Sequence, residues 1–369
     1  MKLHGFELVR LSMPLVAPFR TSFGVQTVRD VLLVRADTGD GVGWGECVAG
    51  GEPLYSSEYV DDAADVIRRF LAPRLLAADR LDPARVGPAL APVRGHRMAK
   101  AAVETAVLDA WLRGRGVPLA AYLGATRDRV PAGVSVGIMD SLPELLDAVA
   151  GYLAQGYLRI KLKIEPGWDV EPVRAVRERF GDDLLLQVDA NAAYQPADTR
   201  QLARLDPYQL LLIEQPLDED DLRGHAALAR HLRTPICLDE SITSARAAAD
   251  AIALGACAVV NIKPGRVGGY LEARRIHDLC HAHGVPVWCG GMLETGVGRA
   301  ANVALAALPA FTLPGDTSAS SRYYAQDITP PFELAGGQLG VPSGPGIGVD
   351  PIPDTLRELT TSKEWLAAR

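Results

Sequence analysis

The feature that most constrains the fold is the spacing of five charged residues. Lys163, Asp189, Glu214, Asp239 and Lys263 follow one another at intervals of 26, 25, 25 and 24 residues, and each ends or directly follows a short apolar run. The stretches between these runs carry apolar residues at helical spacing, so each interval holds one strand and one helix. Repetition of this unit predicts a barrel of parallel strands surrounded by helices.

The apolar runs of the repeat start near residue 130. They read GVSVGI, YLRIKLKI, LLLQVDAN, LLLIEQP, PICLDES, AVVNIKP and PVWCGG, with FTLPGD as a weaker eighth candidate. Side chains at the carboxyl ends of barrel strands all face the same mouth. We therefore expect a barrel over residues 129–320 whose five charged residues meet at that mouth.

The N-terminal third has a different pattern of apolar and turn residues. Residues 1 to about 60 contain β-branched runs, and VLLVRADTGDGVGWGEC, broken by Gly39 to Gly45, predicts a hairpin. Residues 61 to about 125 are helical in pattern, with MAKAAVETAVLDAWLRG as the clearest helix and Gly114 near its end. A chain of 369 residues suits one large α/β domain with a smaller companion, and we place the smaller α+β domain at 1–128.

Composition excludes several classes of function. The formal net charge is -7, with no basic field for nucleic acid, and no apolar stretch is long enough to span a membrane. The five cysteines are scattered and include no CxxC pair, which indicates free thiols and a reducing cytoplasm. A small molecule is the expected partner.

Three of the five charged residues are acids on consecutive strands. Asp189, Glu214 and Asp239 would form an oxygen-rich set of the kind that binds hard cations such as Mg²⁺, and without a cation they would repel one another. The alternative is that each acid caps the helix that follows it. Capping does not require three acids in register, so the pattern favours a metal site.

The lysines are concentrated at the same place. The chain has 32 arginines and only 6 lysines, and three of the six are Lys161, Lys163 and Lys263. Lys161 and Lys163 share one face of their strand because strand side chains alternate. Arginine stays protonated in proteins, whereas a desolvated lysine can lose its proton. We interpret the lysines as bases; the alternative is a set of structural ion pairs with the acids.

Two lysines facing each other across a divalent metal suit one type of reaction. A metal that holds a substrate carboxylate stabilises the enediolate formed when the adjacent carbon loses its proton. A base on each face can then remove or return that proton. The arrangement predicts a racemase, or a dehydratase or cycloisomerase that begins with the same abstraction.

The motifs RIKLKIEPGWD, LQVDAN, LIEQPL, CLDES, NIKPGRVGG and GDTSAS extend this pattern over most of the chain. Through them the sequence resembles the enolase superfamily, its muconate-lactonizing branch, and within that branch the N-acylamino acid racemase and o-succinylbenzoate synthase family. The resemblance implies a modified TIM barrel whose α+β capping domain includes the C-terminal segment 321–369. It also implies mobile loops at 14–24 and 49–59 that bring Phe19, Phe23 and Tyr55 to the substrate pocket.

The same resemblance assigns roles to residues. Lys163 and Lys263 would be the acid/base pair, Asp189, Glu214 and Asp239 the Mg²⁺ ligands, with Mn²⁺ or Co²⁺ as substitutes. Lys161 would hold the substrate carboxylate and lower the pKa of its neighbour. Glu240, Asp316 and Asn191 would support the site from behind the ligands. The residues expected to line the substrate pocket, besides the three aromatic residues above, are Ser135, Asn191, Gly291, Met292, Leu293 and Tyr323.

We therefore expect racemisation of N-acylated amino acids, with o-succinylbenzoate synthesis as a second activity. The alternatives are that o-succinylbenzoate synthesis in menaquinone biosynthesis is the native role, or that the chain is another cycloisomerase. GDTSAS lacks the Asp-x-Asp of dipeptide epimerases, which disfavours free dipeptides. A barrel retained only as a scaffold is disfavoured because all five charged residues are present. The resemblance implies a homo-oligomer, an octamer or a dimer.

One other cluster could suggest a metal site. His277, His281 and His283 lie in RIHDLCHAHG, where two histidines are four residues apart. No glutamate follows the first histidine, and the helix precedes a strand, so it should lie on the outer ring of the barrel. We expect these histidines to have surface roles.

Overall fold

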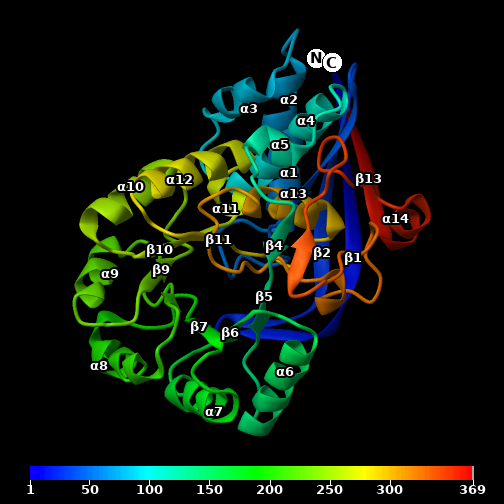
Figure 1. The fold of residues 1–369 in the computed structure, drawn as a ribbon. Helices are drawn as coiled ribbons and strands as arrows, with labels where there is room; N and C mark the ends of the chain where they lie inside the picture. Colours follow the sequence, from blue (N-terminus) through cyan, green and yellow to red (C-terminus); the bar gives the residue numbers. More distant parts are fainter. Residues whose placement is uncertain (368–369) are drawn as a thin grey trace.

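Two sheets organise residues 1–367, which are the residues that this computed structural model describes (Figure 1). The first is antiparallel, with strand order β13-β1-β2-β3. Its strands are β1 (Leu3–Thr21), β2 (Gly24–Thr38), β3 (Gly41–Cys47) and β13 (Thr360–Ala367). Because β13 pairs with β1, with Gly5 opposite Ala367, the start of β1 lies beside the end of β13.

Helices cover one face of this antiparallel sheet. They are α1 (Val60–Val66), continued through a π-helical turn (Ile67–Leu71) into α2 (Ala72–Leu76), then α3 (Pro83–Leu90) and α4 (Arg97–Arg113). The contact between α4 and β3 is close because β3 has glycines there: a Cβ on Gly43 would lie 2.2 Å from the backbone nitrogen of Ala110, and one on Gly45 would lie 2.1 Å from the carbonyl of Ala102. The glycines of the GDGVGWGEC stretch therefore serve helix packing as well as the predicted hairpin.

The second sheet is parallel and curled, with strand order β11-β10-β9-β8-β7-β6-β5. Its strands are β5 (Gly133–Val136), β6 (Arg159–Lys163), β7 (Leu185–Asp189), β8 (Ile213–Glu214), β9 (Ile236–Leu238), β10 (Val259–Ile262) and β11 (Val287–Cys289). The helices between and after them are α6 (Leu142–Ala154), α7 (Val170–Phe180), α8 (Thr199–Ala203), α9 (Leu222–Ala229), α10 (Ala245–Leu254), α11 (Pro264–Val267), α12 (Tyr270–Ala282) and α13 (Gly296–Ala306). The predicted architecture of a parallel barrel with an α+β cap is confirmed.

The eighth strand candidate, FTLPGD, is not a strand. Residues 310–316 make only isolated bridges, Phe311 to Val287 on β11 and Gly315 to Ala132 before β5. Pro314 has no N–H to donate, so a regular ladder cannot pass through this segment. The segment still fills the eighth position and closes the ring, because Gly133 N donates to the carbonyl of Gly315 at 2.7 Å.

The segment 14–24 also differs from expectation. It was expected to be a loop, but it forms the ends of β1 and β2, which extend beyond the sheet as a hairpin with an irregularity between Pro14 and Phe19. Hydrogen bonds tie the hairpin to the barrel mouth: Ile138 N donates to the carbonyl of Arg20 at 3.0 Å, and the Ser22 hydroxyl to that of Ala190 at 3.4 Å. The cap therefore reaches across the mouth on this side.

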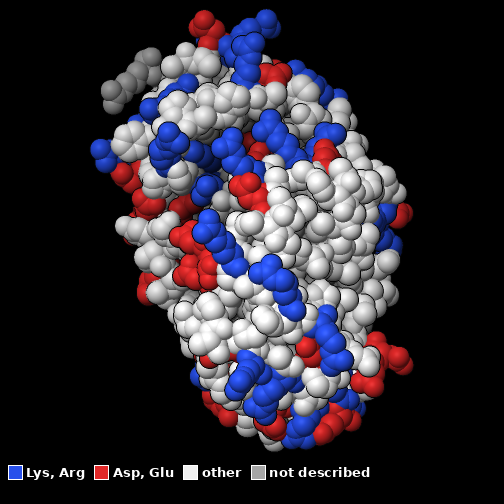
Figure 2. All heavy atoms as spheres, turned by 90° about the vertical axis from the view of Figure 1, so that its left-hand side faces the viewer, with Lys and Arg blue, Asp and Glu red and all other residues white. Residues whose placement is uncertain are grey.

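The remaining elements connect the two parts. They are α5 (Leu119–Leu123), the two-stranded pair of β4 (Arg129–Pro131) with β12 (Gln338–Gly340), and α14 (Pro353–Leu359). The expected domain borders at residues 128 and 320 stay a prediction. Within residues 1–367, no helix has both the length and the hydropathy needed to cross a bilayer. On the face drawn in Figure 2, basic and acidic side chains are interspersed.

Candidate active site

Three of the five spaced residues occupy one register row of the parallel sheet. Lys163 on β6 pairs with Asp189 on β7, which pairs with Glu214 on β8. The nearly equal repeat lengths produce this alignment, since each unit returns the chain to the same level of the barrel. All three residues are buried, and each is the last residue of its strand.

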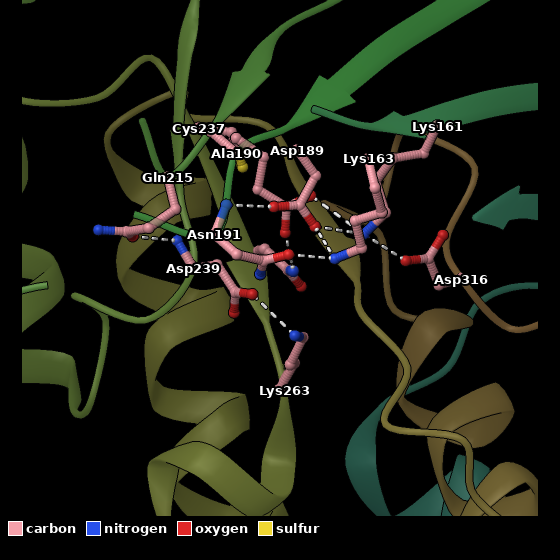
Figure 3. Close-up of polar contacts among 12 residues, drawn as sticks. Lys161, Lys163, Asp189, Ala190, Asn191, Gln215, Cys237, Asp239, Lys263 and Asp316 are labelled. Atoms are coloured by element: carbon pink, nitrogen blue, oxygen red, sulfur yellow. Dashed lines mark hydrogen bonds and ion pairs between the residues drawn. The ribbon is translucent and has the colours of Figure 1, made fainter. Parts of the chain in front are cut away.

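The other two spaced residues directly follow β9 and β10. The amine Nζ of Lys263 lies 2.7 Å from Oδ2 of Asp239. Lys163 and Lys263 reach the carboxylates from different sides of the cluster (Figure 3). The structure thus places two amines and three carboxylates together at the carboxyl end of the strands.

Lys161 lies one layer below Lys163 and contacts three acids. Its amine is 2.6 Å from Asp316, 3.1 Å from Glu214 and 3.2 Å from Asp189. Burial alone would lower the pKa of Lys161, but the three carboxylates outweigh burial and raise this pKa above its ordinary value. The surrounding carboxylates therefore favour the charged form of Lys161.

Lys163 is held by an acid and an amide. Its amine donates to Oδ2 of Asp189 at 2.6 Å and to Oδ1 of Asn191 at 2.5 Å. Asn191 in turn donates from Nδ2 to Glu240 at 2.8 Å and from its backbone to Asp189 at 3.0 Å. Asn191 and Glu240 thus lie behind the carboxylates, and Asn191 also reaches the pocket.

The two candidate bases have opposite pKa shifts. Burial lowers the pKa of Lys163; Asp189 counteracts part of this effect, and the Lys161 ammonium adds to it. Burial acts on Lys263 in the same direction, but Tyr55, Glu240 and other neighbours outweigh it and raise the pKa of Lys263. One amine is favoured as a neutral base and the other as a charged acid, which is the separation that acid–base pairs use.

The carboxylates have further partners that fix their orientation. Nδ2 of Asn261 donates to Oε1 of Glu214 at 2.7 Å, and the Arg266 guanidinium forms an ion pair with Asp239. In this conformation the cationic side chains occupy the carboxylate oxygens, and no three His, Cys, Asp or Glu side chains within residues 1–367 are arranged around a common metal position.

The chemistry of the donor set nevertheless fits a hard divalent cation. Asp189, Glu214 and Asp239 offer buried carboxylate oxygens from consecutive strands, the ligand type that Mg²⁺ prefers. Neighbouring Glu240 has a buried oxygen, Oε2, with no hydrogen-bond partner. A cation bound here would take over carboxylate oxygens that the amines now contact.

Sequence reasoning missed three cationic or amide side chains of the site. Arg159 is fully buried beneath Lys161 and forms a 2.9 Å ion pair with Asp316. Asn261 and Arg266 flank Lys263 and contact two of the carboxylates. The alternation of strand side chains could have identified Arg159 and Asn261, because each lies two residues before a lysine that was assigned to the site.

A cavity of about 330 Å³ opens above the amines. Phe19 and Tyr323 meet edge to face at 6.2 Å, and Phe23 lies 6.1 Å from Tyr55, so aromatic rings from cap and barrel surround the opening. Asp316 and all three lysines also line the cavity. The expected pocket residues that line it are Phe19, Phe23, Tyr55, Ser135, Asn191, Gly291, Met292, Leu293 and Tyr323.

The histidine cluster on α12 is not a surface feature throughout. His281 and His283 are exposed, but His277 is buried. Its Nε2 accepts a hydrogen bond from the backbone N–H of Ala310 at 3.1 Å, and its ring stacks on Phe311. The expectation of a surface role was wrong for His277, which instead anchors the irregular segment that closes the barrel.

Comparison with known families identifies both parts of the chain. The family model described as mandelate racemase/muconate lactonizing enzyme, N-terminal domain, matches residues 6–124. The model described as enolase C-terminal domain-like matches residues 144–355. The two matches correspond to the cap and to most of the barrel.

Individual relatives align over nearly the whole chain. An N-succinylamino acid racemase of Amycolatopsis sp is 70% identical, covering 100% of both chains. An o-succinylbenzoate synthase of Geobacillus kaustophilus is 51% identical, covering 93% of this chain and 92% of its own. A crystal structure of an enolase superfamily member from Listeria innocua has a TM-score of 0.96 at 41% identity and covers 100% of both chains.

Proposed function

The chain belongs to the mandelate racemase/muconate lactonizing enzyme family of the enolase superfamily, and we propose that it racemises N-acylated amino acids. The observation that carries the proposal is that Lys163 contacts Asp189 and Lys263 contacts Asp239 from different sides of one cluster of carboxylates. A substrate α-carbon held between two amines can lose its proton to one of them and receive a proton from the other.

Enzymes of this family depend on a divalent metal, and we propose Mg²⁺ for this chain, with Mn²⁺ or Co²⁺ as substitutes. Asp189, Glu214 and Asp239 would hold the ion. Bound there, the ion would supply positive charge to the substrate carboxylate as that group takes up the charge of the departing proton. The chain's own residues perform the remaining steps.

Lys161 would hold the substrate carboxylate at the floor of the cavity. It is a fixed cation over the Trp288 ring, with its amine 4.8 Å from the ring centre. Its charge also favours the neutral form of Lys163, the amine suited to remove the proton. For the enantiomer that faces Lys163, Lys263 would deliver a proton to the opposite face; for the other enantiomer the two lysines would exchange roles.

The pocket favours an acylated amine over a free ammonium. Phe19, Phe23 and Tyr323 are aromatic. Two acids line the cavity: Asp316 is already paired with Lys161 and Arg159, and Glu52 is exposed in the cap segment. An ammonium group beside the lysines would therefore meet Asp316 only as a carboxylate that is already paired. The names of relatives support an N-succinyl group as the acyl substituent.

Synthesis of o-succinylbenzoate is a second candidate function. Relatives at 46–51% identity carry that name, and the dehydration begins with abstraction of a proton next to a carboxylate, so the same lysines could perform it. We keep a role in menaquinone biosynthesis, a cytoplasmic location and a homo-oligomeric state, dimer or octamer, as proposals. Light scattering tests the last of these.

The experiment that tests the racemase proposal removes each lysine in turn. Lys163→Ala and Lys263→Ala should both abolish racemisation of N-succinylphenylalanine, followed by polarimetry or chiral chromatography. Lys→Arg at either position should behave like Ala, because arginine keeps its proton. Lys363→Ala, which removes an exposed lysine from β13, is the matched control and should racemise like the parent. Racemisation above a tenth of the parental rate by either active-site variant would refute the two-base assignment.

A further inference from the structure

The hydroxyl of Tyr55 makes direct contact with one of the two amines. It accepts a hydrogen bond from Nζ of Lys263 at 3.0 Å and lies 3.2 and 3.3 Å from the two oxygens of Asp239, to which it can donate. The Lys263 amine also sits 4.6 Å from the centre of the Tyr55 ring, within reach of a cation–π interaction. Tyr55 thus contacts Lys263 with both its hydroxyl and its ring.

Tyr55 belongs to the cap, in the segment 49–59 between β3 and α1. The ends of the segment are tied down: Val60 N donates to the carbonyl of Gly50 at 2.8 Å, and the carboxylate of Glu58 accepts from Met98 N at the start of α4. Residues 51–54 between these ties are exposed. Tyr55 therefore reaches the barrel from a segment that is anchored at its ends and solvated along its middle.

The partner of Lys163 comes from the barrel instead. Asn191 lies just after β7, accepts from the Lys163 amine at 2.5 Å, and is itself held by Asp189 and Glu240. The two amines therefore have similar neutral polar partners that differ in origin. The hydrogen-bond partners of Lys163 all belong to the barrel, whereas Lys263 has all of its partners only when the cap segment is in place.

We propose that Tyr55 is a positioning residue for Lys263, so that the cap segment 49–59 completes one face of the active site while the other face is complete in the barrel alone. The inference rests on the proposed racemase function. The hydroxyl accepts one N–H of the Lys263 amine and Asp239 accepts another, and together they fix the direction of the third toward the cavity. Loss of the hydroxyl leaves the amine in place but poorly aimed.

The test compares the two faces of one enzyme. Tyr55→Phe is incubated in heavy water with each enantiomer of N-succinylphenylalanine, and mass spectrometry with chiral separation follows deuterium uptake with retention and with inversion. Deuterium uptake with retention of configuration reports on a single lysine. The amine that removes the α-proton becomes an ammonium with three interchangeable hydrogens, and it can return a deuteron to the same side of the α-carbon. The single-lysine variants identify which enantiomer faces which amine.

For the enantiomer that faces Lys163, we expect uptake with retention within about twofold of the parent and inversion slower by about 10-fold, the scale of one hydrogen bond to a charged group. For the enantiomer that faces Lys263, both processes should slow by about 10-fold. Asn191→Gly should give the mirror-image pattern. Glycine suits that site because Asn191 has a positive φ of 42°.

Controls separate this inference from the proposal on which it rests. Ser57→Ala changes an exposed residue of the same segment and should match the parent on both faces. The ratio of the two faces within one preparation is independent of how much protein is folded. Equal slowing of both faces by Tyr55→Phe, or none, would overturn the role of Tyr55. Racemisation by a single-lysine variant would instead overturn the proposed function.

Discussion

The carboxyl group of Glu46 gives a quantitative prediction about how cap and barrel are joined. Glu46 is on β3 of the cap and accepts hydrogen bonds at the start of barrel helix α13, from the Thr295 hydroxyl at 2.6 Å and from Gly298 N at 3.0 Å. Burial raises the pKa of Glu46 from 4.5 to about 7, although the bonds from Thr295 oppose the shift. The folded protein therefore holds a proton on Glu46 more tightly than the unfolded chain does.

The sign and size of the effect follow from linkage. A raised pKa in the folded state gives stability that is fully present below the unfolded pKa of 4.5 and is lost as the pH rises through the folded pKa of about 7. The shift corresponds to about 3 kcal/mol of unfolding free energy. Glu46→Gln cannot ionise, so its unfolding free energy should lack this loss.

The assay is urea unfolding of parent and variant at pH 4.5 and pH 8, monitored by circular dichroism. Between these values the parent should lose about 3 kcal/mol more than Glu46→Gln. Glu104 and Asp109, whose pKa values burial also raises, to about 7 and about 6, are present in both proteins and cancel. Glu358→Gln, at an exposed position of α14, is the control. Parallel pH profiles, within about 0.5 kcal/mol, would refute the reasoning.

Three further predictions test other parts of the molecule. Removal of divalent ions by a chelator should abolish turnover, and added Mg²⁺ should restore it; full turnover in metal-free protein would contradict the assignment of a metal site. Asp239→Asn should lower kcat by at least about 100-fold, with a much smaller change in melting temperature. N-acetyl and N-succinyl derivatives of methionine or phenylalanine should racemise faster than dipeptides, and chiral chromatography showing the reverse order would rule out our choice of substrate class. Gly45→Ala should destabilise the cap by about 1–3 kcal/mol, because the new Cβ would lie 2.1 Å from the Ala102 carbonyl; thermal unfolding measures this effect.

The barrel and the position of its charged residues could be predicted because both depend on local periodicity. Repeats of about 25 residues set the strands, and the two-residue period of a strand sets which side chains face inward. The same period predicts that Arg159 and Asn261 face inward, although neither residue was assigned to the site from the sequence. The prediction of a strand at FTLPGD was wrong, because its apolar residues are typical of a strand but Pro314 prevents a regular ladder there.

Contacts between cap and barrel could not be predicted from the pattern. Tyr55 was expected in the pocket, yet its hydrogen bond to Lys263 joins residues separated by 208 positions and depends on how the two parts pack. Glu46 carried no signal at all, since an acid at the end of a strand is ordinary in sequence. Such contacts depend on tertiary packing between residues far apart in the chain, and no local periodicity in the sequence marks them.

The pairing of β13 with β1 has a consequence for how the protein is made. Leu11 on β1 is paired with Thr360 on β13, so the ribosome must translate the whole barrel before β1 gains its outer neighbour. At about 5–20 residues per second, the wait lasts for tens of seconds. During that time the nascent chain carries a long strand with an open edge, the kind of surface that pairs with the wrong partner. Synthesis of this enzyme therefore has a vulnerable interval that ends only with its last strand.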